Sequence, residues 1–209
     1  PMNKSDGPSS KRSITTATKI TIGRLLLIPV FVGFAVHYGQ TVSEGKPVEL
    51  YRWLAVATFI LASVSDALDG YIARKFNQHS RLGKILDPAA DKGLMLAAVI
   101  TLTFSSWPGG LPLWLTTIII SRDVLLILGA LLLNHVAGHV RIRAHWTGKV
   151  ATCFQMVLLA WVMLQFPEGV LKQVILAIAG TFTFLSAVLY VTDGIHQAQA
   201  SGHGEAEND

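Results

Sequence analysis

The sequence predicts an all-α, polytopic membrane protein with six transmembrane helices and both termini in the cytoplasm. Of its 209 residues, 51% are hydrophobic and only 14% are charged, compared with about 25% charged residues in an ordinary soluble domain. The apolar residues form six long runs, and Lys and Arg gather in alternate polar segments. This pattern excludes disordered and collagen-like chains, and we expect no nucleic-acid partner, because a basic balance in such a chain reflects cytoplasmic loops.

Each apolar run is compared with the roughly 20 residues that a helix needs to cross a bilayer. The six runs are Ile20–His37, Trp53–Val64, Ala89–Trp107, Leu111–Leu133, Val150–Phe166 and Val170–Val191. The second is too short unless the polar residues after it continue the helix towards Tyr71 inside the protein. A soluble all-helical bundle is the alternative, but six such runs joined by short polar turns are hard to bury in water.

Three segments follow from these boundaries. Residues 1–19 form a polar N-terminal segment with room for a juxtamembrane helix, residues 20–193 form the six-helix domain, and residues 194–209 form a polar tail that we expect to be disordered. With the N-terminus inside, most of the 17 Lys and Arg residues lie in cytoplasmic segments, and only Lys46, Arg52 and Lys172 lie outside. The positive-inside rule favours this orientation.

Four aspartates gather at the cytoplasmic junction of the second and third spans, where ionisable residues are functional candidates by default. Residues three or four apart share a helix face. Two such faces are predicted, one with Asp66, Asp69, Gly70 and Ala73, the other with Gly83, Asp87 and Asp91. The turn between the helices allows the faces to meet, so we expect the four carboxylates to converge.

Four bare carboxylates repel one another, and a hard divalent cation removes that repulsion. Carboxylate oxygens suit Mg²⁺ or Mn²⁺, and Mg²⁺ is commonly shared between carboxylates and substrate phosphates. The glycines and Ala73 let a ligand approach the backbone, and Arg74 can pair with phosphate. The alternatives are solvated salt bridges, a cation or proton transporter, or a lipid-binding scaffold. A transporter usually places its acids near the midplane between repeats, and this sequence has no visible repeat.

The stretch resembles the signature of the CDP-alcohol phosphotransferase family, D-x2-D-G-x2-A-R-x8-G-x3-D-x3-D. Every specified position matches, with Asp66, Asp69, Gly70, Ala73, Arg74, Gly83, Asp87 and Asp91. Outside it, Thr21 to Arg24 and Gly148 to Met156 resemble segments of phosphatidylglycerophosphate synthases. The Ser121-Arg122-Asp123 stretch departs from their usual A-R-E and is similar to cardiolipin synthases of the same superfamily.

The resemblance implies an enzyme that transfers a phosphatidyl group from CDP-diacylglycerol to an alcohol and releases CMP. It implies two Mg²⁺ (or Mn²⁺) ions held by Asp66, Asp69, Asp87 and Asp91, with Asp91 also the general base. It places nucleotide binding at Asp66, Asp69, Gly70, Ala73, Arg74 and Gly83. It further implies a homodimer among membrane lipids, in a bacterial cytoplasmic (inner) membrane, with the active site on the cytoplasmic side.

Glycerol 3-phosphate is the expected acceptor, which would give phosphatidylglycerophosphate. Its phosphate needs a basic pocket, for which we predict Arg122, Arg143 and Lys149. Asp123 points about 100° away from Arg122 on a helix and is not an automatic partner. Phosphatidylglycerol, giving cardiolipin, and inositol phosphate or serine are the alternative acceptors. Pro88 either starts or kinks the third helix, and the sequence leaves both open.

Overall fold

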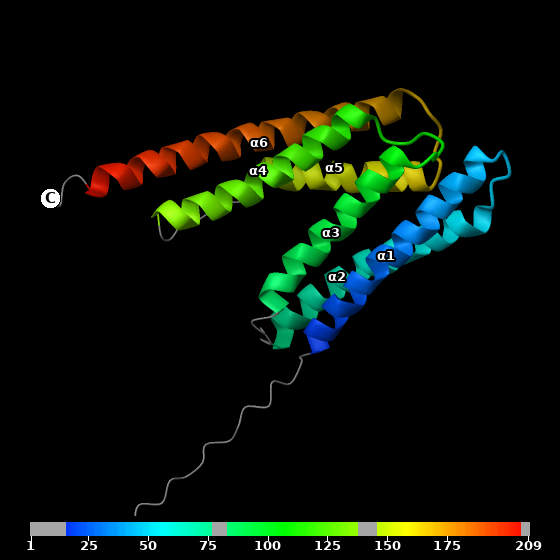
Figure 1. The fold of residues 1–209 in the computed structure, drawn as a ribbon, viewed down its shortest axis with the longest axis horizontal. Coiled ribbons are helices and arrows are strands. Elements are labelled where there is room, and N and C mark those ends of the chain that lie inside the picture. Colours follow the sequence, from blue (N-terminus) through cyan, green and yellow to red (C-terminus); the bar gives the residue numbers. More distant parts are fainter. Residues whose placement is uncertain (1–15, 77–82, 138–145, 206–209) are drawn as a thin grey trace, which may run out of the picture.

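The computed structural model describes the backbone of residues 16–76, 83–137 and 146–205, and the side chains within 21–65, 92–129 and 146–195. The described backbone forms six helices and no strand (Figure 1). In chain order they are α1 (Thr16–Ser43), α2 (Glu49–Phe76), α3 (Gly83–Phe104), α4 (Leu113–Ala137), α5 (Trp146–Met163) and α6 (Val170–Glu205). The prediction of an all-helical protein is confirmed.

Two helices extend further than their apolar runs. The short second run does continue as a helix: α2 passes through Asp66 and Asp69 and ends at Phe76. At the other end of the chain, α6 continues to Glu205, so the expectation of a disordered tail from residue 194 is wrong for residues 194–205. That prediction was based on the polar composition of the tail as a whole. The Gln and Ala residues after Ile195, however, have high helix propensity.

The helices pack as two groups of three. Among the described residues α1 packs along both α2 and α3, and α6 packs along both α4 and α5, whereas α3 meets α4 and α5 over shorter stretches. Figure 1 shows α6 running along α4 and α5, α1 beside α2, and α3 between the α1–α2 pair and the other three helices. The buried core runs through both groups and includes Phe31, Phe59, Leu102, Leu115 and Leu158.

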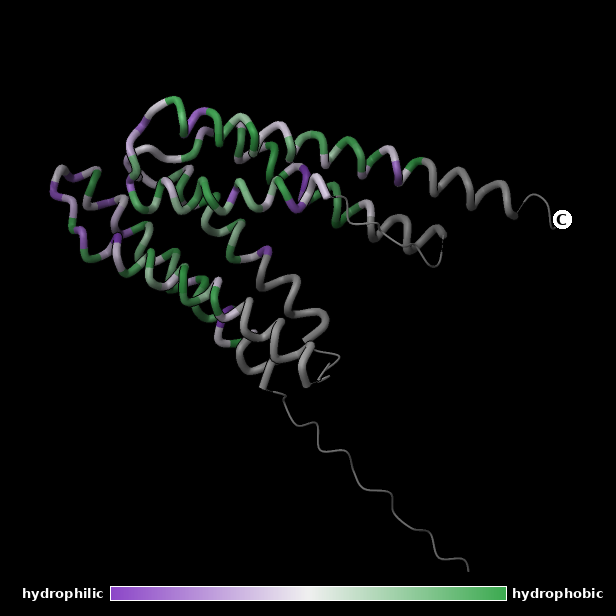
Figure 2. The backbone as a smooth tube through the Cα atoms, turned by 180° about the vertical axis from the view of Figure 1, so that it is seen from behind, coloured by the Kyte–Doolittle hydropathy of each residue, from purple (hydrophilic) through white to green (hydrophobic). Residues whose placement is uncertain are grey.

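Many large apolar side chains face outwards along these helices, as expected where the surroundings are lipid. Leu26, Leu61, Phe104, Val170 and Phe184 are each more than half exposed, and Figure 2 shows long hydrophobic stretches along the helices. Within the described residues, three helical segments are long and apolar enough to cross a membrane: Thr21–Ser43, Trp146–Met163 and Val170–Ile195. These features indicate a membrane protein.

The three described connections between helices gather at one end of the molecule (Figure 1). Trp107, in the α3–α4 connection, donates its indole N–H to the carbonyl oxygen of Ala35 on α1 at 2.8 Å and packs against the ring of Tyr38. Lys172, at the start of α6, donates to the carbonyl oxygen of Gly109 and pairs with Glu168. These contacts tie the two helix groups together at the end opposite the aspartate motif.

Candidate active site

The aspartate motif occupies the facing ends of α2 and α3. At a rise of about 1.5 Å per residue, Asp66 and Asp69 lie about 15 and 10 Å from the end of α2, and Asp87 and Asp91 lie about 6 and 12 Å from the start of α3. Only residues 77–82 separate the two helices in the chain, so their connected ends must be close. The backbone therefore brings both halves of the motif to one end of the bundle and to similar depths.

The rest of the motif follows the same helices. Gly70, Ala73 and Arg74 lie in the last turns of α2, and Gly83 is the first residue of α3. Pro88 lies inside α3 rather than at its first residue, so the helix does not start at the proline. The side chains of the motif, from Asp66 to Asp91, lie outside the described residues.

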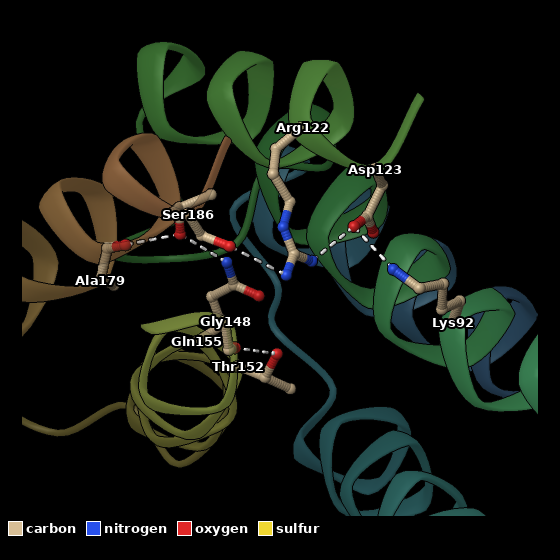
Figure 3. Close-up of polar contacts among 9 residues, drawn as sticks. Lys92, Arg122, Asp123, Gly148, Thr152, Gln155, Ala179 and Ser186 are labelled. Atoms are coloured by element: carbon tan, nitrogen blue, oxygen red, sulfur yellow. Dashed lines mark hydrogen bonds and ion pairs between the residues drawn. The ribbon is translucent and has the colours of Figure 1, made fainter. Parts of the chain in front are cut away.

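A buried ion-pair cluster begins one residue after the motif. Lys92 on α3 and Arg122 on α4 both donate to the same oxygen of Asp123, Oδ1, each at 2.7 Å (Figure 3). Asp123 is 2% exposed and Arg122 is 7% exposed, whereas the side chain of Lys92 is 36% exposed. Buried charges of this kind are retained only when they are paired. We therefore name Lys92, Asp123 and Arg122 the charged triad.

The pairing of Arg122 with Asp123 differs from the sequence-based expectation. Adjacent residues leave a helix about 100° apart, but the long arginine side chain bends back so that its Nη1 reaches the carboxylate. Asp123 has a second partner, Lys92 on α3. No pattern in the sequence indicates this pairing, because the two residues lie on different helices. Lys92 and Asp123 are thus the site residues that sequence reasoning missed.

The other side of Arg122 faces α5 and α6. Its Nη2 lies 3.4 Å from the hydroxyl oxygen of Ser186 on α6. Gly148 on α5 lies against the same nitrogen, and a Cβ built at this glycine would lie 2.8 Å from Nη2. The guanidinium therefore sits where four helices meet, with α3 and α4 on one side and α5 and α6 on the other (Figure 3).

Polar contacts continue from Arg122 along α5, in the segment from Gly148 to Gln155. We call the contacts around Arg122 and along this segment the polar seam. Thr152 donates to the carbonyl oxygen of Gly148 at 2.9 Å. Gln155, 2% exposed, donates from Nε2 to the hydroxyl oxygen of Thr183 on α6 at 2.8 Å. Among the described residues, the Arg122 Nε and the Gln155 Oε1 are buried without a hydrogen-bond partner. The seam therefore combines paired charges with unused donors and acceptors.

The three residues predicted to bind the acceptor phosphate differ in their surroundings. Arg122 is buried in the charged triad, and Lys149 is exposed near the start of α5. Arg143 lies outside the described residues. Among the described side chains no group of three or more His, Cys, Asp and Glu could hold a metal ion, and that set does not include the four aspartates of the motif.

Most of the chain is similar to proteins of one known family. Residues 14–185 match the CDP-alcohol phosphatidyltransferase family. The chain is 31% identical over 187 residues to a cardiolipin synthase (CMP-forming) from Streptomyces coelicolor, covering 88% of this chain and 81% of that protein. It is 34% identical over 148 residues to the CDP-diacylglycerol--glycerol-3-phosphate 3-phosphatidyltransferase of Escherichia coli K12, covering 70% and 75%. The chain thus belongs to the CDP-alcohol phosphatidyltransferase family.

Proposed function

We propose that this protein transfers a phosphatidyl group from CDP-diacylglycerol to the hydroxyl of glycerol 3-phosphate, releasing CMP and forming phosphatidylglycerophosphate. One observation carries the proposal: all eight specified residues of the motif are present on the connected ends of α2 and α3 in a member of this family. A transporter or a lipid-binding scaffold gives no reason for a complete motif of this kind.

The donor set of the motif fits divalent metal ions. Four carboxylates on two adjacent helix ends offer only oxygen ligands, which suit Mg²⁺ or Mn²⁺. Asp66, Asp69, Asp87 and Asp91 would hold two such ions. When bound, they would neutralise the diphosphate of the donor and polarise the phosphate under attack. The same donor set does not favour zinc or copper, because none of the eight specified residues of the motif is His or Cys.

The residues of the motif have distinct roles in this proposal. Asp91 accepts the proton of the acceptor hydroxyl as its oxygen attacks the phosphate. Gly70 and Ala73 leave space for the nucleotide next to the backbone of α2, and Gly83 does so at the start of α3. Arg74 pairs with a phosphate of the donor. Asp66 and Asp69 serve both the metal ions and the nucleotide.

The acceptor is assigned from a relative and from charge. The E. coli relative is named for transfer to glycerol 3-phosphate, and an acceptor with its own phosphate needs cations beyond the motif. Arg122, Arg143 and Lys149 would supply them. The second candidate is a cardiolipin synthase that uses phosphatidylglycerol, favoured by the Streptomyces relative, which matches a larger share of this chain.

The setting of the reaction is also part of the proposal. We place all six helices across a bacterial inner membrane, with both termini and the motif on the cytoplasmic side, because Lys and Arg gather in the segments on that side. We further propose a homodimer. Chemical labelling in intact cells tests the orientation, with single cysteines introduced at Glu44 and Lys149 after the exposed Cys153 has been replaced by Ser. The two positions should react from opposite sides.

Measurement of CMP release by the purified protein in detergent tests the reaction. CDP-diacylglycerol and Mg²⁺ would be supplied with glycerol 3-phosphate, phosphatidylglycerol, inositol phosphate or serine. We expect release only with glycerol 3-phosphate, and its loss in Asp91→Asn. Glu44→Gln is the matched control, because this exposed carboxylate lies at the opposite end of the molecule. Release only with phosphatidylglycerol would instead identify a cardiolipin synthase, and no release from folded protein would refute both.

A further inference from the structure

We propose that Lys92 and Asp123 are positioning residues for phosphatidyl transfer. Their ion pair holds α3, which carries Asp87 and Asp91, in register with α4, which carries Arg122. The inference rests on the proposed function, because it assigns the pair a role in the same reaction. Neither residue belongs to the motif, and neither is assigned contact with a substrate here.

The first argument is where α3 and α4 touch. Two polar contacts join these helices among the described side chains. One is a hydrogen bond of 2.6 Å between the hydroxyls of Thr103 and Thr116, and the other is the ion pair of Lys92 with Asp123. The two contacts are about 17 Å apart along α3, at a rise of about 1.5 Å per residue. Only the ion pair lies beside the motif, one residue from Asp91.

The second argument is that α3 and α4 pack against each other only over a short length. Among the described residues α3 meets α4 over a much shorter stretch than α1 meets α2 or α5 meets α6. A directional contact is then needed to fix the depth and rotation of α3. An error of about 1 Å in the position of a reacting group can cost about a hundredfold in rate. The ion pair is suited to preventing such an error, because it couples to α4 the residue next to the proposed base.

The third argument is the shared oxygen. Lys92 Nζ and Arg122 Nη1 both lie 2.7 Å from Asp123 Oδ1, so one carboxylate separates two cations. Removing its charge leaves the buried Arg122 facing Lys92, which is 36% exposed, and the two cations then repel each other across a partly buried site. Loss of Asp123 should therefore displace both α3 and the guanidinium of Arg122. Loss of Lys92 should release α3 alone, since Asp123 and Arg122 remain paired.

Four variants and steady-state kinetics in detergent test the proposal. We expect Lys92→Met to lower kcat about tenfold and Asp123→Asn about a hundredfold, with the KM for CDP-diacylglycerol changed less than about twofold. Asp123→Glu keeps the charge and should stay within about threefold of the native kcat. The Lys92→Met/Asp123→Asn double variant should be no slower than Asp123→Asn, because the link is already broken and the facing cation is gone.

The matched control is the pair Lys172 and Glu168, which joins a buried lysine to a carboxylate at the other end of the molecule. Lys172→Met should lower Tm but leave kcat within about twofold. The proposal fails if Asp123→Asn keeps its kcat, if the two substitutions multiply in the double variant, or if Lys172→Met lowers kcat as much as Lys92→Met. A structural role alone would lower Tm without this pattern in kcat.

Thermal unfolding of the same four variants gives a readout that needs no turnover. We expect the Tm losses of Lys92→Met and Asp123→Asn to be non-additive in the double variant. If the native protein releases no CMP with any acceptor, the proposed function fails, and with it the catalytic role of the pair. If the native protein is active but kcat shows no coupling between the two residues, only the positioning role is refuted, whatever the Tm values show.

Discussion

Gly148 and Arg122 approach so closely that no side chain fits between them. A Cβ atom at Gly148 would lie 2.8 Å from the Nη2 of Arg122 and 3.2 Å from the hydroxyl oxygen of Ser186. Because Arg122 is also held at Nη1 by Asp123, its guanidinium has little freedom to move away. The glycine therefore defines one wall of the space that the guanidinium occupies.

Substituting Gly148→Ala is predicted to push Arg122 out of this position. If Arg122 binds the acceptor, the KM for glycerol 3-phosphate should rise about tenfold, which corresponds to about 1.4 kcal/mol, while the KM for CDP-diacylglycerol stays unchanged. Gly33→Ala on α1 is the control, because nothing lies within 4 Å of a Cβ there. Equal KM values for the two alanine variants would contradict the assignment of Arg122 to the acceptor.

Thr183→Val is predicted to destabilise the packing of α5 on α6. The substitution keeps the shape of the side chain but leaves the Nε2 of Gln155 without the acceptor that it uses at 2.8 Å. An unsatisfied buried donor costs about 1–3 kcal/mol, and about 1 kcal/mol is expected inside a helical membrane bundle. Thermal unfolding in detergent measures the loss. Thr192→Val, at an exposed position of the same helix, should leave Tm unchanged, and an equal loss there would contradict the prediction.

Removal of divalent metal is predicted to abolish CMP release. A chelator such as EDTA should reduce the rate at least about a thousandfold, since the donor diphosphate would face four carboxylates without neutralisation. Adding Mg²⁺ or Mn²⁺ back should restore it. Asp87→Asn should raise the Mg²⁺ concentration that gives half-maximal rate, whereas Glu44→Gln should not. Full activity in excess chelator would overturn the assignment of the motif to metal ions.

Trp107→Phe is predicted to weaken the end of the molecule opposite the motif. The variant keeps an aromatic ring against Tyr38 but loses the indole hydrogen bond to the carbonyl oxygen of Ala35. We expect a loss of about 1 kcal/mol in the free energy of unfolding with no change in either KM. Trp146→Phe is the control, because Trp146 is 66% exposed. A changed KM in Trp107→Phe would show that this end communicates with the active site.

The fold was largely predictable because hydrophobic runs of sufficient length dictate helices wherever the surroundings are apolar. The continuation of α2 through Asp66 and Asp69 was predictable too. The motif residues are three or four positions apart, and this spacing places them on one face only if the segment is a helix. The helix after Asp193 was not, because the tail was judged by its polarity and not by its helix propensity.

The candidate site was predictable only where it is local in the sequence. The motif is a contiguous pattern, so its residues could be named at once. The pairing of Lys92 with Asp123 depends on how α3 is rotated against α4, and no spacing within one helix encodes that rotation. The burial of Trp107 could not be predicted for a similar reason, because its partner Ala35 lies on a helix far away in the chain.

The packing of the helices as two groups of three has an evolutionary consequence. On the proposed assignment, the first group contains all eight motif residues. Of the cations predicted to recognise the acceptor, Arg122 and Lys149 lie on helices of the second group, and Arg143 lies between these helices in the chain. The two groups can then diversify at different rates. New acceptor specificities can arise by substitutions in the C-terminal half while the N-terminal half keeps the residues that bind the nucleotide. This requires that the charged triad, which joins the two halves, is kept. Hybrid enzymes with halves from relatives of different acceptor preference would inherit their product from the second half.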